Sequence, residues 1–89
     1  MKPEWSAGSY RELGSVQQYI ALDNNDKVAW NVVMKILETV DLLESHPYTG
    51  RPSEWRDRRE LVIAPYIIVY SVHRSGVRVH SLTHGTQRK

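Results

Sequence analysis

The sequence contains no cysteine. A chain without cysteine forms no disulfide framework, carries no thiolate nucleophile and binds no zinc through sulfur. Its apolar stretches all fall short of the roughly 18 residues that a membrane-spanning helix needs. The opening segment MKPEWSAGSY lacks the apolar core of a signal peptide. Internal repeats, low-complexity tracts and an interdomain linker are also absent. These absences predict a cytoplasmic protein that does not contact a membrane.

The size and composition of the chain limit the range of folds. The chain has 89 residues, which predicts one domain over residues 1–89 that buries about 60% of its unfolded surface. Hydrophobic residues make up 40% and charged residues 25%, an ordinary globular composition. The net charge of +2 is compatible with an acidic partner or a nucleic acid and requires neither.

The first half of the sequence predicts two helices. The segment SAGSYRELGSVQQYIALD begins with Ser6 or Ser9 as a possible N-cap, and Glu12 follows Ser9 at the capping-box spacing. After a short turn, in which Asp26 can cap the next helix, the segment KVAWNVVMKILETVDLLES has apolar residues at helical spacing and ends before Pro47. The apolar stripe of this second helix comprises Val28, Val32, Ile36, Val40 and Leu43, widened by Ala29, Val33 and Leu37.

The second half predicts strands at residues 59–64, 66–73 and 77–84, separated by Pro65 and by the turn RSG. Two consecutive hairpins make an antiparallel meander, and the segment KPEW can add a short edge strand. The expected fold class is therefore α+β, with an N-terminal helical hairpin packed on one face of a small antiparallel sheet.

The strand at residues 66–73 is apolar on both of its alternating faces. We expect Tyr66 and the residues in phase with it to face the helices, which leaves Ile67 and Val69 on the other face beside Val62. An exposed apolar patch on a small protein usually marks a partner surface. The alternative is that the loop and the N-terminal strand fold over that face.

Four arginines interleave with acidic residues where the loop enters the first long strand. This basic segment comprises Arg51, Arg56, Arg58 and Arg59, with Glu54 and Asp57 between them and Glu60 directly after. The interleaving favours a solvated surface whose charges pair with each other. The alternative is a surface that binds phosphate or a target, in which Trp55 stacks on a base or fills a partner pocket.

The histidines lack the spacing of a metal site, so neither a metal nor another cofactor is expected. Period-two spacing places Arg78, His80, Leu82 and His84 on one face of the last strand, which is either a cationic face or a half-exposed edge. His84 could act as a general acid or could hydrogen-bond a backbone carbonyl. Trp30 lies off the centre of the helical stripe, at the edge of the core or in a partner contact.

Several short motifs in this order resemble the RelE/ParE superfamily of bacterial toxins, and within it the ParE-like branch. The motifs are EWS, QYIALDN, LLESHPYTGRP, RREL, PYIIVYSV and LTHG, which together span nearly the whole chain. The resemblance implies a toxin of a type II toxin–antitoxin system. Such a toxin is held inactive by a cognate antitoxin whose acidic, amphipathic C-terminal segment wraps it. For this chain the implied antitoxin-binding residues are Trp30, Val62, Ile67 and Val69.

The resemblance implies two classes of target. ParE-like members bind and poison DNA gyrase, whereas RelE-like members are ribosome-dependent endoribonucleases that cut mRNA; a third possibility is a non-toxic relative that binds its antitoxin. The target-binding residues would be Arg51, Arg58, Arg59, His84 and Arg88, and a ribonuclease would use Arg58 and His84 in catalysis. Similar ribonucleases carry an arginine after the tyrosine that begins the central strand, where this chain has Ile67, and a C-terminal aromatic, where it ends GTQRK. We therefore expect the gyrase-binding class.

Overall fold

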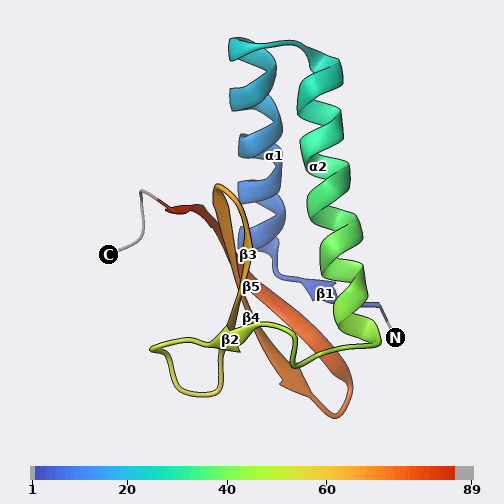
Figure 1. Cartoon of the computed structure of the whole chain (residues 1–89), viewed down its shortest axis with the longest axis vertical. Helices are drawn as coiled ribbons and strands as arrows, with labels where there is room; N and C mark the ends of the chain where they lie inside the picture. The colour runs from blue at the N-terminus through green and yellow to red at the C-terminus, as the bar shows by residue number, and fades with distance from the viewer. Residues whose placement is uncertain (1, 86–89) are drawn as a thin grey trace.

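A helical hairpin packs against a five-stranded sheet in the computed structural model, which describes residues 2–85 (Figure 1). This arrangement confirms the predicted α+β fold. Arg88, which the sequence assigned to target binding, lies outside the described residues. The elements in chain order are β1 (Glu4–Trp5), α1 (Ala7–Asp23), α2 (Asp26–Asp41), the short 3₁₀ helix η1 (Leu42–Glu44), β2 (Arg51–Pro52), β3 (Arg59–Ile63), β4 (Tyr66–His73) and β5 (Gly76–His84).

The strand order in the sheet is β1-β5-β4-β3-β2. Strands β3, β4 and β5 form the antiparallel meander that the sequence predicts. The expected edge strand is also present, but β1 runs parallel to β5, so the sheet is mixed. Strand β2 was not predicted; it pairs Arg51 with Glu60 and Pro52 with Arg59. Among residues 2–85, no helix combines the length and the apolar character that crossing a membrane requires.

Both helices begin at side chains that cap their free N–H groups. The hydroxyl oxygen of Ser6 accepts a hydrogen bond from the N–H of Ser9 at 3.1 Å, so Ser6 is the N-cap of α1. The side-chain oxygen of Asn25 accepts from the N–H of Val28 at 2.9 Å. Asn25 therefore caps α2, and Asp26, the residue that we expected there, is the first helical residue.

The carboxylate of Glu12 holds α1 on the sheet. The capping-box spacing predicted that Glu12 would act locally with Ser9. Instead Glu12 accepts a hydrogen bond from the backbone N–H of Leu82, in β5, at 3.1 Å. A sequence pattern identifies local partners, whereas this partner is 70 residues away and becomes available only after the layers pack.

The buried face of α2 lies slightly to one side of the predicted stripe. Val28 is exposed and Val32 is half-buried, whereas the residues expected to widen the stripe, Ala29 and Val33, are buried. The fully packed side of the α2–η1 segment consists of Ala29, Val33, Ile36, Val40 and Leu43. The stripe shifts because α2 packs mainly on α1 and contacts the sheet less.

The face of the sheet that points away from the helices carries Val62, Ile67 and Val69, but it is not a continuous exposed patch. Val62 is 52% exposed and Val69 is half-buried, whereas Ile67 is 9% exposed. The expectation that Ile67 is exposed is wrong, because its register partners Val62 and Thr83 flank it on both sides. Gly85 also lies close, since a Cβ at that position would be 3.9 Å from Cδ1 of Ile67.

The loop that leads from the helices to the sheet is fixed by the hydroxyl of Tyr70. This hydroxyl accepts a hydrogen bond from the N–H of Gly50 at 2.9 Å and donates one to the carbonyl oxygen of Pro47 at 2.8 Å. Tyr70 is fully buried in β4. A buried phenol needs such partners, because an unpaired buried polar group costs about 1–3 kcal/mol.

Arg59 holds the same loop from the other side. Its Nε donates to the carbonyl oxygen of Gly50 at 2.8 Å, and its Nη2 donates to the carbonyl oxygen of Tyr48 at 3.3 Å. The guanidinium also lies over the Tyr48 ring, 5.3 Å from the ring centroid. Arg59 and Tyr70 together hold residues 47–50 in place against the sheet, although the segment has no regular structure.

Two glycine-to-alanine substitutions should change stability in opposite directions. At Gly50 a Cβ would lie 2.6 Å from both the carbonyl oxygen of Glu60 and the hydroxyl of Tyr70, so Gly50→Ala should destabilise the protein by about 1–3 kcal/mol or more. At Gly14, inside α1, a Cβ would meet nothing within 4 Å. Gly14→Ala should therefore stabilise the protein by roughly 0.5–1 kcal/mol.

Urea denaturation of the two variants and the wild type measures both effects. An unchanged free energy of unfolding in Gly50→Ala would show that the loop moves away at little cost and would contradict the close approach.

Candidate functional site

The arginines of the basic segment have different roles in the structure. Arg59 is used inside the protein, where it holds residues 47–50. Nε of Arg51 lies 3.2 Å from Oε1 of Glu60, whose side chain is 3% exposed. This ion pair is of the kind expected for a surface whose charges pair with each other. Arg56 and Arg58 are the two arginines of the segment whose side chains make no hydrogen bond or ion pair within residues 2–85. Of these two, Arg58 is the one whose charge acts on His80.

A closed loop between β2 and β3 positions Arg58 and Trp55. The N–H of Ser53 donates to the carbonyl of Arg58 at 3.0 Å, and the N–H of Arg58 donates to the carbonyl of Trp55 at 3.2 Å. The hydroxyl of Ser53 accepts from the N–H of Trp55 at 3.0 Å. Both Trp55 and Arg58 remain exposed. They line a surface hollow whose other charged and aromatic residues are Tyr48, Arg56, Asp57, Arg59 and His73.

A cluster of polar side chains lies next to this hollow, on the sheet face that points away from the helices. The hydroxyl of Ser71 is 2.6 Å from Nε2 of His73 and 2.7 Å from Nε2 of His80. Ser71 is buried, with 4% of its surface exposed. The single O–H of Ser71 can donate to only one ring, so at least one of the two Nε2 atoms carries a proton and donates to the hydroxyl oxygen.

The electrostatic surroundings keep the His80 ring neutral. Burial lowers the pKa of His80 below its ordinary value, because a buried site disfavours the charged imidazolium. The positive charges of Arg58 and Arg78 lower this pKa further, followed by the neighbouring His73. The cluster is therefore a cationic environment in which His80 resists taking up a proton at neutral pH.

A β-bulge determines which residues of β5 join this cluster. The register between β4 and β5 shifts between Val69 and Tyr70, where His80 is the extra residue. Period-two spacing predicted one shared face for Arg78, His80, Leu82 and His84, and this prediction is wrong. The bulge places Arg78 and His80 on the face away from the helices and Leu82 and His84 on the helix face.

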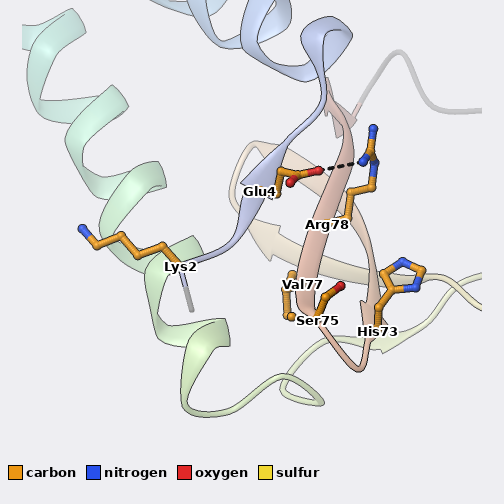
Figure 2. Close-up of a pocket in the computed structure, with 7 residues that line it drawn as sticks. Lys2, Glu4, His73, Ser75, Val77 and Arg78 are labelled. Atoms are coloured by element: carbon orange, nitrogen blue, oxygen red, sulfur yellow. Dashed lines mark hydrogen bonds and ion pairs between the residues drawn. The ribbon is translucent and has the colours of Figure 1, made fainter.

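An ion pair lies beside the cluster, towards the β4–β5 hairpin. Nη1 of Arg78 lies 2.7 Å from Oε1 of Glu4, which fastens β1 to β5 (Figure 2). In Figure 2 the side chains of Arg78 and His73 project to the same side of the hairpin, away from α2. His73 thus lies between this end of the sheet and the hollow beside Trp55.

His84 lies apart from Arg58. Its ring packs edge-on against Tyr66, with 5.6 Å between ring centroids. Tyr66 belongs to the hydrophobic core, so His84 is on the helix side of the sheet. There it lines a groove with Glu12, Val16, Tyr19 and Leu82. Arg58 and His84, the pair that a ribonuclease would use, are therefore not brought together.

The residues expected to bind an antitoxin fall on two separate surfaces. Val62 and Val69 lie on the sheet face away from the helices, next to the buried Ile67. Trp30 is 55% exposed near the start of α2. Figure 1 shows that this end of the helical hairpin projects well beyond the sheet. A segment that contacted both surfaces would have to pass around an edge of the molecule.

Sequence reasoning missed the pairing of Ser71 with His73 and His80. The spacing of Ser71 and His73 on one strand face was a usable signal, because both positions alternate with Tyr70 and Val72. The contact with His80 depends on the bulge, which the sequence does not mark by a glycine or a proline. Within residues 2–85, no group of three or more metal-ligating side chains comes together.

Comparison with known proteins places this arrangement in a family. The family model described as ParE toxin of type II toxin-antitoxin system, parDE, matches residues 4–88. A protein of Sinorhizobium fredii (strain NBRC 101917 / NGR234) that carries the name "Putative toxin Y4kP" is 37% identical over 86 residues, which cover 94% of this chain and 88% of that protein.

A solved structure shares the fold. A chain of the chromosomal ParDE TA system from P. aeruginosa superposes with a TM-score of 0.85 at 20% identity, covering 94% of this chain and 95% of that chain. The family model matches nearly the whole sequence, and the relative from Sinorhizobium fredii extends over almost all of it. The chain therefore belongs to the ParE toxin family of type II toxin–antitoxin systems.

Proposed function

We propose that this ParE-family toxin arrests growth by binding and poisoning DNA gyrase, and that it carries out no chemistry of its own. The observation that carries the proposal is the separation of Arg58 from His84 by the sheet. Cleavage of RNA through the 2′-hydroxyl needs an acid and a base that converge on one phosphate, with cations around it. Arg58 and His84, the pair suggested for that chemistry, do not converge, because they lie on opposite faces of the sheet.

The middle of the sheet face away from the helices supports the same proposal. Val62, Ile67 and Val69 occupy this part of the face. Losing one electrostatic contact to a transition state typically costs about 2.7–4 kcal/mol, a factor of 100 to 1,000 in rate. These three aliphatic side chains cannot supply such contacts to a phosphorane-like transition state, which favours target binding as the use of this part of the face.

Membership of a type II toxin–antitoxin family makes a cognate antitoxin the partner of this protein. We propose that the antitoxin uses an acidic, amphipathic C-terminal segment. Its apolar side would cover Val62 and Val69, and its acidic residues would meet the arginines nearby. Trp30 would be a second contact, reached where the segment extends onto the helical hairpin.

The gyrase proposal predicts that the purified protein inhibits supercoiling by gyrase or traps gyrase-cleaved DNA. Arg58→Gln should weaken this inhibition, because the variant loses an exposed cation that has no partner within the described residues. Arg11→Gln, on α1, removes the same charge away from the Arg58 surface and should leave inhibition unchanged. Supercoiling assays with titrated toxin measure the effect. Codon-specific cleavage of mRNA on programmed ribosomes, with gyrase unaffected, would contradict the proposal.

The antitoxin proposal predicts that Val62→Asp weakens the complex by about 2 kcal/mol or more, because a carboxylate would be buried without a partner. Val62 is the suitable position, since substitution of the buried Ile67 would disturb folding as well. Leu42→Asp, an equally drastic change at an exposed leucine of η1, is the control. Isothermal titration calorimetry with the product of the adjacent gene measures the affinity of both variants. Equal losses of affinity in Val62→Asp and Leu42→Asp would contradict the assigned surface.

A further inference from the structure

The cluster around Ser71 brings polar side chains of β4 and β5 next to the arginine-bearing loop. Ser71, His73 and His80 are joined by hydrogen bonds of 2.6 and 2.7 Å. His73 reaches the hollow that holds Arg58 and Trp55. Donors from three separate segments, the β2–β3 loop, β4 and β5, therefore come together on one sheet face.

The charges that face His80 leave this cluster with an excess of positive charge. Arg78 is compensated by Glu4, at 2.7 Å. On the same face of β3, Glu60 lies 3.2 Å from Arg51. Arg58 has no such partner within residues 2–85, yet it is close enough to His80 to affect its protonation. The hollow is lined by three arginines, Arg56, Arg58 and Arg59, and by one acidic residue, Asp57. The positive charge therefore exceeds the negative, and an anion placed between Arg58 and the histidines would balance it.

We propose that Arg58, His73 and His80 bind the phosphodiester backbone of a single-stranded nucleic acid, with a base stacked on Trp55. A guanidinium makes paired hydrogen bonds to phosphate oxygens, and imidazole N–H groups donate to the same kind of acceptor. An exposed tryptophan beside arginines is the usual platform for an unpaired base. Trp55 and Tyr48 supply this aromatic surface in the hollow that holds Arg58.

This site extends the proposed function without depending on it. If the toxin binds gyrase, the site would place the toxin against a DNA strand that the enzyme has opened. Binding of a free oligonucleotide can be measured without gyrase, so failure of one proposal leaves the other testable.

Binding should be linked to the uptake of a proton. In the free protein Arg58 and Arg78 lower the pKa of His80. A bound phosphate carries the opposite charge and raises that pKa, so the complex holds more protons than the free protein does. Affinity should therefore increase as the pH falls from about 8 towards about 6.

Fluorescence anisotropy of a short labelled single-stranded DNA tests the site, with RNA of the same sequence as a second ligand. At low salt we expect a Kd of roughly 10–100 μM. Arg58→Gln should weaken binding roughly tenfold or more and reduce the slope of log affinity against log salt by about 0.7. Trp55→Ala should weaken binding roughly tenfold. His80→Gln should reduce the pH dependence.

Two matched controls make the result decisive. Arg11→Gln carries the same charge change on α1 and should alter the affinity by less than about twofold. A poly-glutamate peptide of equal charge offers anions without bases and should bind at least about tenfold more weakly than the DNA. Circular dichroism spectra that match the wild type would exclude misfolding of the variants.

The proposal is overturned if the wild type binds neither strand, if Arg11→Gln weakens binding as much as Arg58→Gln, or if the peptide binds as tightly as the DNA. DNA and RNA affinities within a few-fold of each other would support recognition of the backbone. A preference of tenfold or more for DNA or for RNA would show that the protein recognises the sugar, and would contradict recognition through the phosphates. Cleavage of the bound RNA would support the site but overturn the proposal that the toxin has no chemistry.

Discussion

The hydroxyl of Tyr70 is the contact on which the functional half of this protein depends. It lies fully buried in β4 and bonds to both Pro47 and Gly50, the two ends of the segment that leaves the helices. Strand β2 begins directly after Gly50, and the loop with Trp55 and Arg58 follows it. A displacement of the segment would therefore move every exposed group of that loop. Gly50 permits the contact, because a Cβ there would meet Tyr70 and Glu60 at 2.6 Å.

Sequence reasoning found the features that depend on local pattern. The helices, the β3–β4–β5 meander and the short edge strand β1 follow from hydrophobic periodicity and turn residues. Ser6 was one of two expected caps, because the N-terminus of a helix requires a nearby acceptor. The resemblance to ParE toxins rests on short motifs spread over the chain. It therefore did not depend on predicting correctly which face of the sheet the residues of any one strand occupy.

The features that the sequence did not reveal all depend on long-range packing. Glu12 binds the N–H of Leu82, and the bulge at Val69 and Tyr70 turns His80 towards Ser71. One extra residue in a strand reverses the face of every residue that follows, which is why the predicted face of β5 was wrong. Ile67 was expected to be exposed because a strand pattern gives its face but not the size of its neighbours.

The claim that Tyr70 holds the arginine-bearing loop on the sheet is tested most directly by native-state hydrogen exchange at the amide of Gly50. The N–H of Gly50 bonds to the Tyr70 hydroxyl, so in the wild type it should exchange slowly, at a rate set by opening of the sheet. In Tyr70→Phe the same amide should exchange orders of magnitude faster, while the central amides of β4 and β5 remain protected. A Gly50 amide that exchanges freely in the wild type, or equally slowly in both proteins, would contradict the account.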